Sequence, residues 1–147
     1  MRLLLLISCI VLSCQLWSQQ TKDSLLQVWE NPQKPAVERL QAVDQLIREH
    51  FQKKSPDSAY QMAVLEYQLA KENKSLQYEA SAKHLQGKTL FLMGKHTLAL
   101  EALIESNKIH QELNDQKGIA ENWHLIGGIY FEQKDIENAN LENDNLL

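Results

Sequence analysis

Apolar side chains recur every three or four positions along most of the chain, and this spacing predicts α-helices. The clearest stripe, between Pro35 and Gln52, consists of Val37, Leu40, Val43, Leu46, Ile47 and Phe51. The same spacing predicts further helices over residues 56–72, 75–93, 96–113 and 116–133, and a short amphipathic segment over 23–30. We therefore expect an all-α protein.

Turn-forming residues fall between these stripes and support their boundaries. Ser55-Pro56-Asp57 supplies a helix N-cap, a first-turn proline and an acid near the positive helix end. Gly94 can take the left-handed conformation that ends a helix. Asp135 is expected to cap a sixth helix after a break near Gln133.

The second half of the chain matches itself when it is shifted by forty residues, which indicates an internal repeat. The matched residues are Ala80, His84, Leu85, Gly87 and Ala99, which align with Ala120, His124, Leu125, Gly127 and Ala139. Lys74 and Asn114 fall at corresponding joints between helices. An earlier copy is weaker, because Ala59 matches Ala99 but Ile47 stands in place of Gly87.

The last copy carries a recognisable motif. Trp123-x-x-Ile126-Gly127-x-x-Tyr130, followed by Ala139, resembles the tetratricopeptide repeat pattern W-x-x-L-G-x-x-Y and a later alanine. The preceding copy fits less completely, at Gly87, Leu90, Gly94, Ala99 and Leu103. The resemblance implies a right-handed superhelical solenoid of antiparallel helical hairpins over residues 35–147, with about two and a half to three repeats and the last repeat incomplete.

The spacing of small residues predicts how each hairpin packs. Gly87 and Ala99 are twelve residues apart, as are Gly127 and Ala139. In an antiparallel hairpin this spacing sets them opposite each other, so that the two backbones can approach closely. Large side chains are then expected to fill the wedge between one hairpin and the next, and in the last repeat these are Trp123 and Tyr130. Leu90, Leu103 and Ile126 are expected in the core of the repeats.

The first residues have the composition of an export signal. Arg2 precedes an apolar run from Leu3 to Leu12, which is too short to span a membrane. We expect residues 1–18 to be a signal peptide and residues 19–34 to form an N-terminal capping segment. Alternatively, Val11-Leu12-Ser13-Cys14 resembles a lipobox, in which Cys14 would be lipidated. Both interpretations predict an exported protein, either periplasmic or anchored as a lipoprotein.

Charge and cysteine content narrow the function classes. The 147 residues contain 15 Lys and Arg against 19 Asp and Glu, and no basic run is longer than Lys53-Lys54. Nucleic-acid binding needs a concentrated basic surface, so we do not expect it. Both cysteines, Cys9 and Cys14, lie in the leader, so thiol chemistry is not expected in the folded part.

The motifs indicate no metal, cofactor or catalytic site. Glu121-x-x-His124 has the spacing of a ligand pair in di-iron bundles, but such a site needs two of these pairs and further carboxylates. His84 and His124 occupy the same repeat position, which favours structural or groove-lining roles. We therefore expect no enzymatic activity.

Function is then expected from a binding groove along the first helices of the repeats. The candidate groove residues are Lys83, His84, Lys88, Asn122 and His124. The leading hypothesis is a non-enzymatic protein-interaction scaffold that binds a peptide or a partner helix. The alternative is an extracytoplasmic ligand-sensing region, as in the tetratricopeptide-containing sensor kinases and regulators of Bacteroidetes that the leader and long repeats resemble. Self-association through the C-terminal repeat is also expected.

The two interpretations of the leader predict different mature N-termini. Simple signal cleavage gives a soluble protein that begins near Gln19, whereas lipidation gives a membrane-bound protein that begins at Cys14. Mass spectrometry of the exported protein distinguishes them, and Cys14→Ala alters processing only in the second case. Exported protein that still carries Met1 would contradict both.

Overall fold

The computed structural model describes residues 21–144, and in this range the chain forms helices and no strands. Residues 21–30 are helical. They precede α2 (Ala36–Leu46), a π-helical turn (Ile47–Phe51), α3 (Pro56–Glu72), α4 (Leu76–Leu92), α5 (His96–Glu112) and α6 (Gln116–Asp144). The all-α prediction is confirmed. The predicted signal peptide and Cys14 lie outside the described residues.

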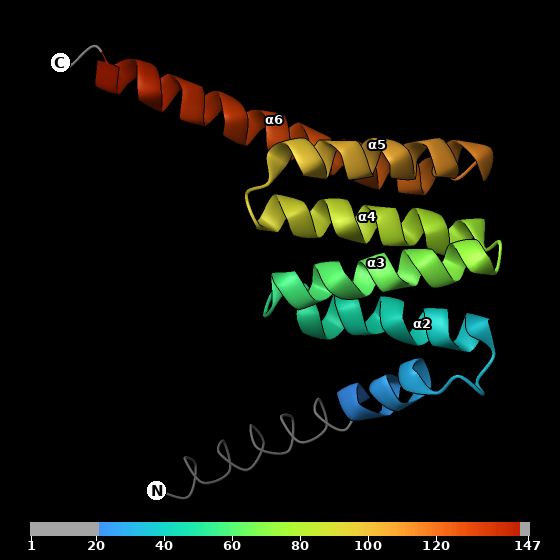
Figure 1. The fold of residues 1–147 in the computed structure, drawn as a ribbon. Helices are drawn as coiled ribbons and strands as arrows, with labels where there is room; N and C mark the ends of the chain where they lie inside the picture. The colour runs from blue at the N-terminus through green and yellow to red at the C-terminus, as the bar shows by residue number, and fades with distance from the viewer. Residues whose placement is uncertain (1–20, 145–147) are drawn as a thin grey trace, which may run out of the picture.

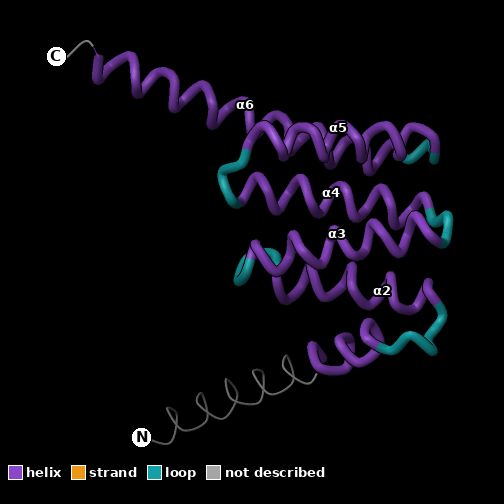
Figure 2. Tube along the Cα trace, in the orientation of Figure 1, coloured by secondary structure: helices purple, strands orange, loops and turns teal. Residues whose placement is uncertain are grey.

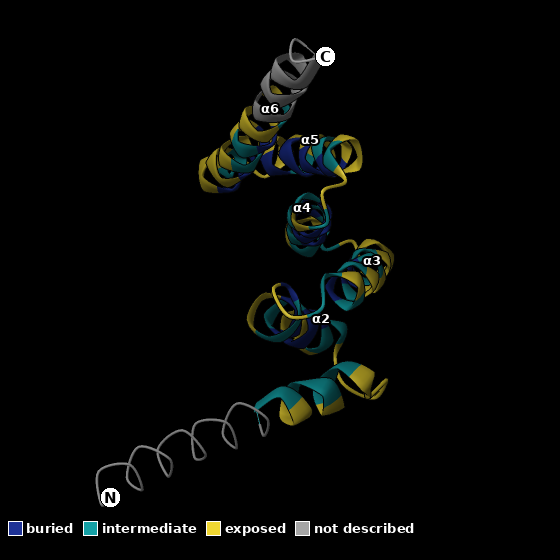
Figure 3. Cartoon of the chain, turned by 90° about the vertical axis from the view of Figure 1, so that its left-hand side faces the viewer, coloured by how far each residue is buried: buried dark blue, intermediate teal, exposed yellow. Residues whose placement is uncertain are grey.

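Consecutive helices lie side by side and run in alternating directions (Figures 1 and 2). Each of α3, α4 and α5 packs against the helices before and after it, and α4 also contacts both α2 and α6. Seen from the side, α3 lies away from the line that joins α2 and α4 (Figure 3). This arrangement places α2, α4 and α6 in one row, in which the candidate groove is found.

The three central helices are equal in length and end in the same way. α3, α4 and α5 have 17 residues each. Each is followed by one residue with positive φ, at Lys74 (54°), Gly94 (69°) and Asn114 (55°), which are twenty residues apart. At each joint an amide N–H reaches back five residues at 2.9 Å, from Ser75 to Ala70, Lys95 to Leu90 and Asp115 to His110. This Schellman-type ending turns the chain back at regular intervals.

The start of α3 follows the sequence prediction except for its cap. Pro56 is the first residue of α3 and Asp57 lies in its first turn, as expected. Ser55 occupies the N-cap position, but its side chain makes no capping bond. Its Oγ instead lies 2.9 Å from Oγ of Ser58.

The core consists of two apolar clusters along the stack. One joins α2, the π-helical turn, α3 and α4 through Val43, Ile47, Ala59, Ala63 and Leu85. The other joins α4, α5 and α6 through Leu90, Ala99, Ala102, Leu103, Ile126 and Ile129.

The predicted close approach of α4 and α5 is confirmed at Gly87. A Cβ atom placed there would lie 2.6 Å from Cγ of Leu103 and 3.2 Å from the carbonyl oxygen of Ala99. Leu90, Ala99, Leu103 and Ile126 are all buried.

The prediction for the last repeat is wrong. α6 continues unbroken to Asp144, so no helix begins at Asp135. Gly127 and Ala139 lie on the same helix, about 18 Å apart along its axis, and cannot face each other across a hairpin. The segment from Gln133 onward contains no glycine or proline that would oppose continuation of the helix.

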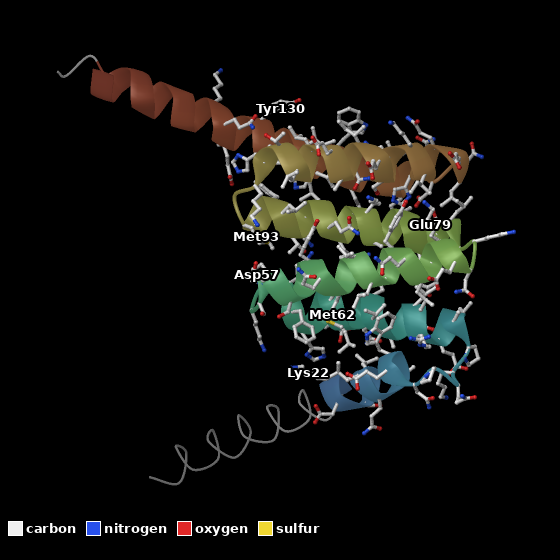
Figure 4. All side chains as sticks on the ribbon, in the orientation of Figure 1. Lys22, Asp57, Met62, Glu79, Met93 and Tyr130 are labelled. Atoms are coloured by element: carbon white, nitrogen blue, oxygen red, sulfur yellow. The ribbon has the colours of Figure 1, made fainter. Side chains whose placement is uncertain are left out.

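The environment of Gly127 follows from this continuous helix. No atom of another element lies within 4 Å of a Cβ placed at Gly127. Trp123 and Tyr130, which were expected to fill a wedge between hairpins, are each 59% exposed. Tyr130 lies at the outer edge of the stack (Figure 4).

The two glycines should therefore respond in opposite ways to the same substitution. Gly87→Ala forces Leu103 to move within a packed core and should lower the free energy of unfolding by about 1 to 3 kcal/mol. At Gly127 the added methyl group meets open space, and alanine favours the helix more than glycine does. Gly127→Ala should therefore raise the free energy of unfolding by up to about 1 kcal/mol. Urea unfolding of both variants measures the difference. Equal effects at the two positions would contradict the packing described for α4 and α5.

Candidate binding groove

A groove of about 610 Å³ lies along the row formed by α2, α4 and α6. The turn after α2 contributes Arg48, and α4 contributes His84 and Lys88. The side formed by α6 consists of Lys117, Ala120, Glu121, His124 and Leu125. Three of the five candidate groove residues, His84, Lys88 and His124, thus line one cavity.

The groove residues recur at the forty-residue spacing of the repeat. Arg48 stands forty positions before Lys88, and His84 forty before His124. Arg48 was not among the candidates, because the first copy of the repeat matches the others weakly. Its spacing from Lys88 was the signal in the sequence that could have identified it.

A smaller cavity of about 270 Å³ adjoins the groove near the joint between α5 and α6. It shares Arg48, His84, Lys117 and Glu121 with the larger groove. Its remaining lining residues are Gln77, Ser81, His110, Asp115 and Gly118. The two cavities together form a depression that follows α4 and the first turns of α6.

Positive charge predominates in the groove. Arg48, Lys88 and Lys117 line it together with one carboxylate, that of Glu121. Lys88 makes no ion pair with any residue in the range 21–144, and its pKa is lowered by burial and by the nearby charges of Arg48 and Lys53. Lys117 Nζ lies 3.7 Å from Oε1 of Glu121. An anionic group placed among these cations would relieve their repulsion.

Arg48 is held in the groove wall by a polar cluster between α2 and α4. Its Nε lies 2.6 Å from Oδ2 of Asp44, and its Nη2 donates a 2.8 Å hydrogen bond to Oγ of Ser81. Ser81 in turn donates to Oδ1 of Asp44. These contacts orient the guanidinium, although its side chain remains 40% exposed.

Asn122 was predicted to line the groove, but it is fully buried beneath it. Its Oδ1 lies 2.7 Å from Nδ1 of His84, and its Nδ2 donates to Oγ of Ser106 and Oδ1 of Asn107 at 2.9 and 2.8 Å. Because the amide nitrogen is engaged as a donor, Nδ1 of His84 donates the proton to Oδ1. Asn122 therefore fixes the orientation of a groove residue instead of meeting a ligand.

The surroundings of His84 favour its neutral form. Burial lowers its pKa, while the hydrogen bond to Asn122 acts in the opposite direction and is the smaller effect. With the proton on Nδ1, Nε2 of neutral His84 is an acceptor.

Lys83 lies outside the groove, contrary to the sequence prediction. Its Nζ is 2.5 Å from Oε2 of Glu105 on α5 and 4.5 Å from the ring centroid of Tyr67 on α3. Neighbouring residues on a helix point about 100° apart, so Lys83 and His84 face different surfaces of α4.

Glu66 is a fully buried acid next to this cluster. Neither of its carboxyl oxygens has a hydrogen-bond partner among the described residues. Burial, followed by the negative charge of Asp44, raises its pKa to about 9. The side chain is therefore protonated at neutral pH, which avoids a buried unpaired charge.

Among residues 21–144, no group of three potential ligands could hold a metal ion. Within the same part of the chain, no helix has the length and apolar character needed to cross a membrane. Comparison of the chain with protein-family models, with curated proteins and with solved structures gives no significant match.

Glu66→Gln should stabilise the protein increasingly as the pH rises. Unfolded glutamate loses its proton near pH 4.5, whereas folded Glu66 keeps it until about pH 9. Between these values the unfolded state binds fewer protons, so stability falls with pH. Glu66→Gln removes this pH-dependent loss of stability, so it should raise the free energy of unfolding by on the order of 3 kcal/mol at pH 7.

Urea unfolding at pH 5 and pH 8 measures the effect, with Glu112→Gln on exposed α5 surface as the matched control. The difference in the free energy of unfolding between Glu66→Gln and the unsubstituted chain should widen as the pH rises. The difference between Glu112→Gln and the unsubstituted chain should stay constant. A Glu66→Gln difference independent of pH would contradict the protonated state of buried Glu66.

Proposed function

We propose that the chain is an exported, non-enzymatic interaction module that binds an acidic segment of a partner protein in the groove between α2, α4 and α6. The observation that carries the proposal is the cluster of Arg48, Lys88 and Lys117 around a cavity of about 610 Å³. Pockets of this size are typical of ligand-binding sites in proteins. The side chains that surround it suit carboxylate or phosphate groups.

The architecture proposed for this module is a right-handed solenoid of tetratricopeptide-like hairpins. Two features support it: the regular joints at twenty-residue spacing and the close contact of Gly87 with α5. In such an assembly each hairpin contacts its neighbours, and the first helices line an extended surface. Here α2, α4 and α6 are those first helices.

The chemistry of the groove favours binding over catalysis. Two of its side chains are fixed from behind: Asp44 and Ser81 hold Arg48, and Asn122 holds neutral His84. Ordered donors on a rigid helical surface lose little conformational entropy when a ligand binds. The expected partner is a segment that carries several carboxylates, because three cations line the groove.

A labelled glutamate-rich peptide should bind the chain more tightly than its glutamine-rich counterpart, and its affinity should fall with salt. Lys88→Ala should weaken binding by about tenfold, because Lys88 has no partner within the described chain and is free to meet the ligand. Fluorescence anisotropy measures both effects.

Lys83→Ala is the matched control, since Lys83 is on the same helix and points away from the groove. It should leave the affinity unchanged. Equal losses for Lys83→Ala and Lys88→Ala would mean that binding reflects overall charge and not the groove. Failure of the peptide to bind at any salt concentration would overturn the proposal.

A further inference from the structure

Within residues 21–144 one face of α6 is apolar and exposed, and it adjoins the groove at Ala120. Trp123, Tyr130 and Phe131 are 59%, 59% and 69% exposed. Gly127 lies between them, and a Cβ placed there would meet no atom within 4 Å. Ala120 and Lys134 extend the same face by one helical turn in each direction, and both are exposed.

The corresponding face of α4 is packed. Gly87 stands forty residues before Gly127, and there Leu103 and Ala99 of α5 press against the glycine. Among residues 21–144, no helix lies on the equivalent surface of α6 at Gly127. A glycine flanked by large apolar side chains is thus a surface on which another helix can lie closely.

The exposed aromatic side chains supply nearly half of the area that each partner buries in a standard dimer interface. A fully buried aromatic side chain contributes 150 to 250 Å², so the three exposed aromatics present about 350 Å² of apolar surface. A patch of this size is comparable to the largest apolar patch of a typical soluble monomer, which is often a binding surface. Together with Ala120, Gly127 and the stem of Lys134, it supplies a large part of the roughly 800 Å² that each partner buries in a standard interface.

The face is also symmetric about its glycine. Trp123 lies four residues before Gly127 and Phe131 four residues after it, while Ala120 and Lys134 lie seven residues before and after. Two antiparallel copies related by a two-fold axis at Gly127 would set Trp123 of each against Phe131 of the other. The long stem of Lys134 would cross the small Ala120. Such self-complementarity is what a two-fold interface demands.

We propose that this face of α6 binds the same face of a second copy of the chain, with the two helices antiparallel and Gly127 at the two-fold axis. α6 is 29 residues long, about 43 Å, and its C-terminal part projects beyond the stack (Figure 1). Gly127, Tyr130 and Phe131 do not line the groove, and the proposed contact meets the groove wall at Ala120.

Sedimentation equilibrium of the purified chain tests the pairing, with Gly127→Glu as the decisive variant. In the monomer the new side chain enters open space, and glutamate favours the helix more than glycine does. In the dimer two carboxylates would meet at the axis, so the dissociation constant should rise at least about tenfold. Leu98→Glu is the control, because Leu98 is an exposed apolar residue of α5 outside this face.

The expected result is a dimer for the unsubstituted chain and for Leu98→Glu, and a monomer for Gly127→Glu with unchanged helical circular dichroism. Phe131→Ser provides a second test if Gly127→Glu loses helicity, and it should also be monomeric. A chain that is monomeric up to about 0.1 mM would overturn the proposal. A dimer that persists in both Gly127→Glu and Phe131→Ser would also overturn it. So would a dimer that Leu98→Glu disrupts as strongly as these two variants do. The glutamate-rich peptide should bind Gly127→Glu as it binds the unsubstituted chain, which separates this test from that of the groove.

Discussion

The contact of Leu103 with Gly87 is the constraint on which the rest of the stack depends. It lets α5 approach α4 so closely that the side chains of Leu90, Ala99, Leu103 and Ile126 close into one core. α6 packs on α5 and also contacts α4, so its position follows from this approach. The groove exists because α6 then stands beside α4 with Lys117 and His124 opposite His84 and Lys88.

Polar groups are buried behind the groove at a cost to stability, and they position the side chains that face it. Asn122 connects His84 to Ser106 and Asn107, and Ser106 donates to the carbonyl oxygen of Ala80. Satisfied networks of this kind rigidify a core because every alternative arrangement leaves a polar atom unpaired. The position forty residues before Ser106 is occupied by Glu66, which has no such partner and must be protonated. Ser106 and Glu66 thus occupy equivalent positions of the repeat, but Ser106 is hydrogen-bonded and the carboxyl oxygens of Glu66 have no partner among the described residues.

α6 has three surfaces with different chemistry. Asn122, Ile126 and Ile129 are buried against the stack, while Lys117, Glu121 and His124 line the groove. Trp123, Tyr130 and Phe131 form the third surface and remain exposed. Because 3.6 residues make one turn, these three sets of side chains point in different directions from one helix.

The sequence by itself determined the helices, their joints and the close approach of α4 and α5. These features depend on local signals, such as the apolar period, Pro56 and Gly94, or on a small residue at a repeated position, as at Gly87. Burial within the repeat could also be anticipated for Leu90 and Ile126, since their spacing places them on inward faces.

Only the tertiary structure decided which polar residues face the groove and where α6 ends. Asn122 and Lys83 have ordinary polar side chains, and their burial or pairing depends on Ser106, Asn107 and Glu105 from another helix. Arg48 enters the groove because the stacking of α2 on α4 brings it beside Ser81. The motif around Trp123 and Tyr130 suggested a packed hairpin, yet α6 runs on past Lys134. A helix turns back only where the contacts of the returning segment outweigh the cost of a left-handed residue, and that balance is set by distant packing.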